Sequence, residues 1–322
     1  MRVADSAWDN RPVAAWLLTC AAMVAVMVGL GGLTRLTGSG LSMVEWNLHH
    51  ILPPLSDAEW RDAFAKYRAT PQYRLVNAGM DLAGFKGIFW LEYVHRLWGR
   101  LIGVVFAVPL AALVWRRAVD RRLLGRLALL LALGAAQGGL GWFMVASGLV
   151  DRPEVSHYRL AAHLVLALAI LAALVWTALD VMGARRTVAP RGAWGAAALV
   201  LVTAAWGALV AGLDAGLVYN TFPLMNGRWL PGDGLDILEA HGAVQFAHRV
   251  LAVSTVVALT VVAARARRRP FILAAGWAWV QAGLGVATLL SHVAVPLAAA
   301  HQMGAVVLVV LLTWGLHGTR SG

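Results

Sequence analysis

The sequence contains almost no cysteine. Cys20 is the only one in 322 residues, so the chain can form neither an internal disulfide nor a metal site built from several thiolates. Cys20 lies within an apolar run, where a small thiol usually packs as a core residue. The sequence therefore predicts a fold that is held together without covalent crosslinks.

Charged residues are also scarce. They make up 13% of the chain, hydrophobic residues make up 60%, and the mean hydropathy is +0.70. A water-soluble domain of this length cannot hide so much apolar surface in its interior. The composition therefore predicts an integral membrane protein.

The apolar residues gather in runs close to the roughly 20 residues that a helix needs to cross a bilayer. Eight runs lie at 13–33, 94–115, 127–147, 159–181, 193–213, 243–263, 271–290 and 297–317. The first run has no small-residue cleavage site, so we expect a retained helix and not a signal peptide. The runs predict an all-α protein with eight transmembrane helices.

The net charge of +11 lies on one side of these spans. Arginines gather in the N-terminal tail, at the C-terminus, and in alternate connections at 116–126, 185–191 and 265–269. Excess arginine on alternate short loops marks the cytoplasmic side of a membrane protein, so we expect both termini in the cytoplasm. The charge is thus interpreted as a topology signal, and no nucleic-acid partner is expected.

The second half of the chain repeats the first in the same order. EYVHRLWGRLIGV (92–104) matches QFAHRVLAVSTVV (245–257), AAQGGLGWFMVAS (135–147) matches WVQAGLGVATLLS (279–291), and LAAHLVLALAIL (160–171) matches AAAHQMGAVVLVV (298–310). GGLTRLTGSGLSMVEWN (31–47) has an echo in GALVAGLDAGLVYNTFPLMNG (207–227). Four spans per unit make the units parallel repeats. We predict two pseudo-symmetric four-helix bundles, over residues 1–185 and 186–322.

Four histidines recur in this repeat, His95 and His163 in the first unit and His248 and His301 in the second. Each falls within the first turns of a predicted span that starts on the outer side, so we expect all four at a similar depth. A lone histidine there is more often a packing residue, but ionisable groups at matched depth are usually functional. Two imidazoles from facing helices suit axial ligation of haem iron. Zinc or copper would need a third ligand, which neither unit offers.

Glycines and arginines near these histidines leave alternatives open. The glycines on the third span of each unit either allow close helix packing or leave clearance for a flat macrocycle: Gly138, Gly139, Gly141, Gly283 and Gly285. Arg96 and Arg249 directly follow a repeated histidine, and Arg100 lies one turn beyond Arg96. These guanidinium groups either pair with haem propionates or extend to lipid headgroups.

The repeat breaks at one position of chemical interest. Glu92 precedes His95 by three residues and shares its helical face, whereas Gln245 precedes His248. A carboxylate beside one site and an amide beside the other favours a division of labour, with proton handling in the first bundle and a permanent redox cofactor in the second. The alternative is that Glu92 is an interfacial carboxylate paired with Arg96 or Arg100.

The outer connection at residues 34–90 is long, and its patterns predict amphipathic helices at 56–68 and 71–84 that cover the first site. His49 and His50 lie in it, and we interpret them as solvated and not as ligands. The histidines without a repeat partner are interpreted as loop or interfacial residues: His157, His241, His292 and His317.

The motifs LEYVHRLWGR, YRLAAHL, FAHR and AAHQ, in this order on eight spans, with GGLTRLTGSGLSMVEW after the first, resemble the haem A synthase family. The resemblance is to the branch shared by alphaproteobacteria and mitochondria, and it covers nearly the whole chain. It implies an oxidoreductase that converts the C8 methyl group of haem O, by successive hydroxylations, to the formyl group of haem A. It further implies that His95 and His163 hold the substrate haem, that Glu92 is catalytic, and that His248 and His301 ligate the iron of a resident haem b.

Two other functions remain open from the residues alone. A two-haem b-type electron carrier would use the same histidines and exchange electrons with a quinone, but it would modify nothing. Haem transport would explain the sites but not why Glu92 is replaced by Gln245. Another branch of the family carries a cysteine pair in the first outer loop, and since this loop has none, no thiol–disulfide step carries over.

Partners and location follow from the same reading. We expect haem O as substrate, an electron donor, contact with a haem O synthase that hands over the substrate, and membrane lipid around the spans. Small residues on lipid-facing helices permit a homo-oligomer without requiring one. An N-terminal tail of about 12 residues is too short for a mitochondrial transit peptide, which favours a bacterial cell inner membrane.

Overall fold

The computed structural model describes residues 11–45, 51–149, 153–184, 188–232 and 234–318. Within them the fold is all-α, and eight helices are long and apolar enough to cross a membrane. These are α1 (Arg11–Leu36), α4 (Leu82–Trp115), α5 (Arg121–Gly148), α6 (His157–Val181), α7 (Ala193–Gly212), α8 (His241–Ala266), α9 (Arg269–Leu290) and α10 (Val295–His317). Each overlaps one predicted run, so the prediction of eight transmembrane helices is confirmed.

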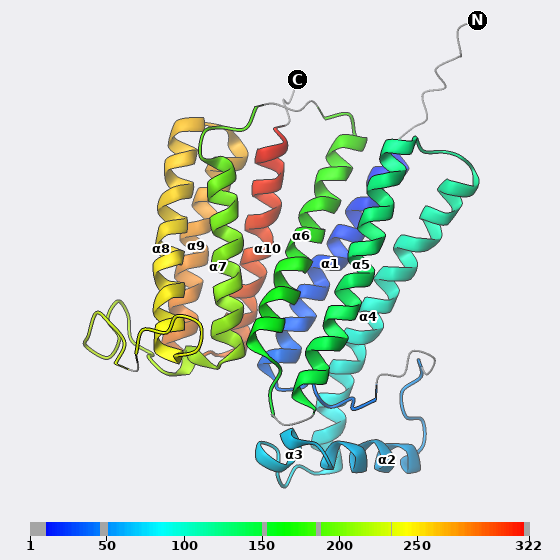
Figure 1. Cartoon of the computed structure of the whole chain (residues 1–322), viewed down its shortest axis with the longest axis vertical. Helices are drawn as coiled ribbons and strands as arrows, with labels where there is room; N and C mark the ends of the chain where they lie inside the picture. The colour runs from blue at the N-terminus through cyan, green and yellow to red at the C-terminus, as the bar shows by residue number, and fades with distance from the viewer. Residues whose placement is uncertain (1–10, 46–50, 150–152, 185–187, 233, 319–322) are drawn as a thin grey trace, which may run out of the picture.

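The long helices stand side by side in one layered bundle (Figure 1). In the first half, α4 and α6 each pack against both α1 and α5, and in the second half α8 and α10 each pack against both α7 and α9. The halves touch through α1 with α10, α6 with α7, and α6 with α10. The division into pseudo-symmetric bundles at residues 185 and 186 stays a prediction.

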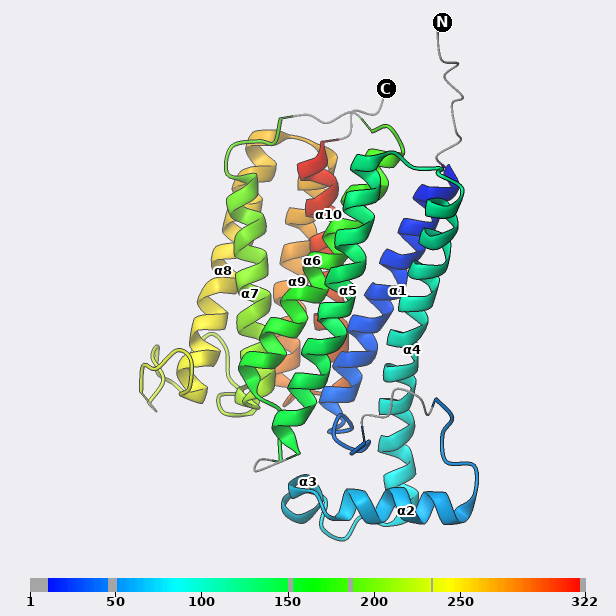
Figure 2. The ribbon, with the colours of Figure 1, turned by 45° about the vertical axis from the view of Figure 1, so that its right-hand side comes forward.

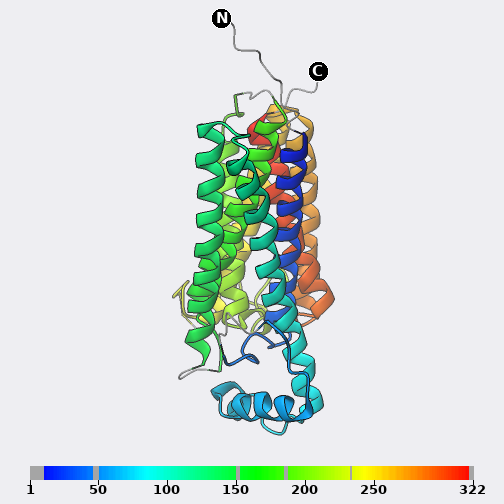
Figure 3. The same cartoon turned by 90° about the vertical axis from the view of Figure 1, so that its right-hand side faces the viewer.

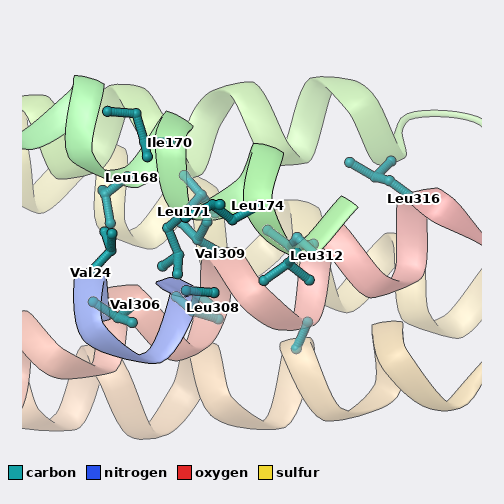
Figure 4. Close-up of a cluster of buried hydrophobic side chains, with 14 of the residues drawn as sticks. Val24, Leu168, Ile170, Leu171, Leu174, Val306, Leu308, Val309, Leu312 and Leu316 are labelled. Carbon is teal, nitrogen blue, oxygen red and sulfur yellow. The ribbon is translucent and has the colours of Figure 1, made fainter. Parts of the chain in front are cut away.

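The main apolar cluster lies where the two halves meet. Figure 4 shows Val24 of α1, Leu171 of α6 and Val309 of α10 among its side chains. Because lipid is as apolar as these residues, their packing stabilises the bundle through van der Waals contact and not through the hydrophobic effect. A polar contact joins the same helices, since the Gln302 side-chain amide donates to the carbonyl of Val28 at 2.7 Å.

Helix α4 begins earlier than the predicted run at 94–115. Its N-terminal turns are capped by Asp81, whose carboxylate accepts from the Gly84 amide at 2.8 Å. The expectation that each repeated histidine lies in the first turns of its helix is therefore wrong for His95, which lies well inside α4. The apolar run failed to locate this start because the first turns of α4 pack aromatic residues against the outer connection and not against lipid.

The outer connection folds into α2 (Asp57–Arg68) and α3 (Pro71–Leu75), with a short 3-10 turn η1 (Ala215–Leu217) in the second half. Figures 2 and 3 show α2 and α3 lying across the end of the bundle, at the N-terminal end of α4. The predicted helix at 56–68 is confirmed, but the one predicted at 71–84 ends at Leu75. The chain turns at Gly79, whose φ of +95° is a conformation that favours glycine.

Candidate functional site

His248 on α8 and His301 on α10 come together in the second half. Their ring centres lie 6.4 Å apart, with the ring planes at 87°. A metal ion held between two imidazoles at about 2 Å from each nitrogen would separate the ring centres by roughly 6 Å. The spacing of this pair therefore fits a shared metal centre such as a haem iron.

Hydrogen bonds orient one ring of this pair. The Nδ1 atom of His301 lies 3.1 Å from the carbonyl oxygen of Gln281, and the Gln281 amide donates to the His301 carbonyl at 2.7 Å. A histidine that donates through Nδ1 leaves Nε2 available as a ligand. In His248, Nδ1 is buried, and the ring contacts the backbone of Thr203.

His95 on α4 and His163 on α6 form the corresponding pair of the first half. The two imidazoles lie near each other. The Gln137 amide donates to the His163 carbonyl at 3.0 Å, as Gln281 does to His301. The Nδ1 atom of His163 is a buried nitrogen without a partner in the described part of the chain. Such unsatisfied buried groups are rare and point to a missing ligand or water.

A glycine of a neighbouring helix faces each of the four rings. A Cβ atom added at Gly31 would lie 3.2 Å from His95, at Gly141 3.1 Å from His163, at Gly207 3.1 Å from His248, and at Gly285 2.9 Å from His301. Gly141 and Gly285 match in the repeat, and so do Gly31 and Gly207, which the sequence analysis did not select. The glycines at these positions thus make room for the imidazoles themselves.

The other glycines singled out on the third spans differ from Gly141 and Gly285. A Cβ atom at Gly138, Gly139 or Gly283 would meet nothing within 4 Å. Because Gly134 and Gly276 on the same helices also meet nothing within 4 Å, the open space leaves both alternatives read from the sequence in place.

Glu92 on α4 is almost fully buried, with 2% of its surface exposed. Its Oε1 accepts from Arg96 at 2.5 Å, and both side chains of this ion pair are buried. Its Oε2 accepts from the hydroxyl of Ser42 at 2.6 Å and from the amide of Met43 at 2.8 Å. Glu92 is therefore paired with Arg96, as one alternative had it, and its catalytic role stays a prediction.

Arg96 also ties the outer connection to α4. Its guanidinium donates to the carbonyl oxygens of Met43, at 2.9 Å, and Glu45, at 3.2 Å. A buried guanidinium with a carboxylate and two carbonyls around it is well compensated for its loss of water. Contacts of Arg96 and Arg100 with haem propionates remain predictions.

Arg249 makes the equivalent contacts in the second half. It donates to the carbonyls of Tyr219, at 2.9 Å, and Pro223, at 3.3 Å, and to the Gln245 side-chain oxygen at 3.3 Å. Tyr219 stands at the repeat position of Met43, so each arginine holds the segment that follows the first helix of its unit. Gln245 is buried like Glu92, but it contributes an amide where the first half has a carboxylate.

The outer cover, α2 and α3, is packed by aromatic rings. Trp60, Tyr67, Phe85 and Phe89 are buried together between α2 and α4. The Tyr67 hydroxyl donates to Gln72 at 3.0 Å, and burial raises the pKa of this phenol. Since the Gln72 amide donates to the carbonyl of Gly38 at 2.9 Å, the cover is also tied to the segment after α1. His49 and His50 lie outside the described residues.

Two of the histidines interpreted as loop or interfacial residues, His157 and His317, are instead buried helix residues. His157, the first residue of α6, is close to Gly212, and a Cβ atom there would lie 2.5 Å from the Cβ of His157. His317, the last residue of α10, has its Nε2 2.9 Å from a carboxylate oxygen of Asp180, whose other oxygen accepts from Arg126 at 2.6 Å. No local pattern predicts this contact, because its partners are far apart in the sequence.

The fold and the site define a class: a membrane protein of eight long apolar helices with partly buried histidine pairs on facing helices. No three His, Cys, Asp or Glu residues within the described ranges form a metal-binding group, so each histidine pair stands alone. Residues 14–313 match the family COX15-CtaA, described as cytochrome oxidase assembly protein. The chain belongs to this family.

Relatives with the name heme A synthase cover nearly the whole chain. The one from Paramagnetospirillum magneticum is 52% identical over 96% of this chain and 94% of the relative. That from Rhodospirillum centenum is 49% identical over 98% of this chain and 90% of the relative. Heme A synthase COX15 of Bos taurus is 43% identical over 97% of this chain and 83% of the relative. The resemblance to the bacterial and mitochondrial haem A synthases is confirmed.

Proposed function

We propose that this protein is a haem A synthase, an oxidoreductase that converts the C8 methyl group of haem O to the formyl group of haem A. Family membership over residues 14–313 supports the activity. In the structure, the main support for this activity is the buried Glu92, one turn before His95. The other half has Gln245 at this position. Family membership gives no support to the alternative of a two-haem electron carrier.

The four repeated histidines divide into a substrate site and a cofactor site. His95 and His163 hold the haem O substrate, and His248 and His301 ligate the iron of a resident haem b. The ring spacing of 6.4 Å and the glycine facing each ring support this assignment. When bound, haem b supplies reversible one-electron transfer.

The charged groups have separate roles in this proposal. Glu92 lies on α4 beside the substrate, where it holds or receives a proton during oxidation. Arg249 contacts the haem b propionates, and Arg96 and Arg100 are the candidates for the substrate propionates. Because the Arg96 guanidinium already donates to Glu92, a haem propionate bound to Arg96 would share this guanidinium with the carboxylate.

The assignment of the two bundles, of the membrane and of the partners rests on the same proposal. Residues 1–185 form the substrate bundle and residues 186–322 the cofactor bundle. The protein lies in a bacterial cell inner membrane with both termini in the cytoplasm. Its partners are an electron donor and a haem O synthase, and a homo-oligomer is compatible with its small lipid-facing residues.

The proposal is tested by the haems that the purified protein retains. Wild type, His95→Met and His248→Met are produced in cells that make haem O but have no other haem A synthase. Haems are then extracted and separated by chromatography, and reduced-minus-oxidised spectra are recorded. We expect His95→Met to lose haem O and haem A but keep haem b, and His248→Met to lose haem b. If only haem b is found in wild type and both variants, the protein is an electron carrier and the proposal is wrong.

A further inference from the structure

The segment that follows α1 closes around the Glu92 carboxylate. The hydroxyl of Ser42 and the amide of Met43 both donate to Oε2, at 2.6 and 2.8 Å, while Arg96 donates to Oε1. Donors on both oxygens fix the rotation of the carboxylate as well as its position. Hydrogen bonds to a charged acceptor are also the stronger kind.

The Ser42 hydroxyl has a single proton, and its geometry favours Glu92. The carbonyl of Ile88 is the other acceptor in range, but it is 3.4 Å away. A 2.6 Å contact is typical of a strong O–H···O bond, whereas 3.4 Å is beyond the usual range. Ser42 itself is buried, so water does not compete for its proton.

The repeat shows that the fold does not need this hydroxyl. Val218 stands at the position of Ser42, and Tyr219 at that of Met43. Arg249 still donates to the Tyr219 carbonyl at 2.9 Å, as Arg96 does to Met43. The turn and its arginine therefore form in both halves, whereas the serine is present only where the carboxylate is.

We infer that Ser42 is a positioning residue for the reaction, which orients the Glu92 carboxylate toward the substrate held at His95. This inference rests on the proposed function. Glu92 lies three residues before His95 on α4, so the rotation of its carboxylate decides which side faces the bound substrate. Without the hydroxyl, Oε2 keeps only the Met43 amide while Arg96 still holds Oε1, so the rotation of the carboxylate is held less tightly.

The inference is tested with Ser42→Ala, with Ser42→Thr, which keeps the hydroxyl, and with Ser39→Ala as the matched control. Ser39 is buried in the same segment, and its hydroxyl bonds to Thr37 at 2.6 Å and not to Glu92. The full chain is produced in the cells described above, and the ratio of haem A to haem O is measured. We expect about a tenfold fall for Ser42→Ala, as for a misplaced catalytic group, with haem b content unchanged. Ser42→Thr and Ser39→Ala should convert haem O as wild type does.

A second readout follows the carboxylate directly. The infrared difference between wild type and Glu92→Gln identifies the bands of the Glu92 carboxylate. Ser42→Ala should shift these bands, and Ser39→Ala should leave them in place. If Ser42→Ala does not accumulate, Ser42→Val introduces the residue that the second half tolerates at Val218.

The outcomes separate the two proposals. Unchanged conversion and unchanged carboxylate bands in Ser42→Ala would overturn the role of Ser42, and so would an equal loss in Ser39→Ala. If wild type forms no haem A, the proposed function fails, whereas the infrared bands still report whether Ser42 holds Glu92.

Discussion

Each of the four candidate ligands has its imidazole ring close to a glycine of a neighbouring helix, which faces Cε1 in three of them and Nε2 in His95. The added Cβ atom would come closest at Gly285, 2.9 Å from His301. Real Cβ atoms do not come so near a ring carbon, so a side chain at this position would push the imidazole aside. The glycine thus controls where the ring stands, although it contributes no atom to the metal.

Gly285→Ala should therefore weaken haem b binding by about tenfold, a loss typical of changes that misorient a metal ligand. Alanine is the better helix former by roughly 1 kcal/mol, so the helix itself should not suffer. The measurement is haem b per protein from reduced-minus-oxidised spectra during titration with haem.

Gly276→Ala provides the control for this change, because it lies on the same helix and a Cβ atom there meets nothing within 4 Å. It should keep wild-type haem b content. Equal haem b content in both variants would mean that the His301 ring tolerates displacement, contrary to the role given to Gly285.

At this scale the sequence predicts the site only in part. The repeat is sufficient to select His95, His163, His248 and His301, because matched positions reveal residues that the fold alone does not require. It does not reveal Ser42 as a partner of Glu92, since that contact joins residues from α4 and a turn 50 positions away. Contacts between distant segments depend on how the helices pack, which no local pattern encodes.

Among the elements, α2 has the most complete local signals. Ser56 accepts from the Glu59 amide at 3.3 Å, and the Glu59 carboxylate accepts from the Ser56 amide at 3.3 Å, which makes a capping box. Together with the aromatic contacts to α4, this cap holds the cover in place over the end of the first bundle.

Ser56→Ala should destabilise α2 by about 1 kcal/mol, because the first turn loses a side-chain acceptor. Amide hydrogen exchange across residues 57–68 should then be faster by about fivefold, while exchange in α8 should not change. Arg61→Ala, an exposed change on the same helix, should leave exchange as in wild type. Equal protection in Ser56→Ala and wild type would show that the aromatic contacts alone maintain α2.

Helix existence was predictable from hydropathy, but helix ends were less so. The apolar run at 94–115 misses the first turns of α4, because Phe85 and Phe89 pack against Trp60 of α2 and not against lipid. The helix predicted at 71–84 ends at Leu75, before the turn at Gly79, and the periodicity of the side chains does not mark this end.

For the whole molecule, the two ends of the bundle differ both in charge and in the elements that lie there. The start of α1 and the end of α10 lie at the same end of the bundle, opposite α2 and α3 (Figure 1). The described arginines of the α4–α5 and α8–α9 connections lie at this end too, which is the arrangement that directs a membrane protein's orientation.

We expect a fluorescent protein fused after Gly322 to fold and fluoresce, since it would remain in the cytoplasm. Alkaline phosphatase fused after Trp229, in the outer connection of the second half, should be active, because that enzyme needs the oxidising periplasm. The reverse pattern, with an inactive phosphatase and no fluorescence, would contradict the proposed orientation.

The repeat predicted which helices belong together, but it did not predict how the two halves join. Their interface includes the contact of Asp180 with His317 and the contact of Gln302 with Val28. Neither has a counterpart in the matched segments, because an interface between halves depends on surfaces that the repeat does not compare.

The length of α4 has a mechanical consequence. This helix runs without interruption from Leu82, beneath the cover, to His95 and beyond. Because the helix is continuous, the part of α4 that packs against α2 and the part that carries His95 move together. A displacement of α2 would therefore tilt the His95 ring without any direct contact between the two.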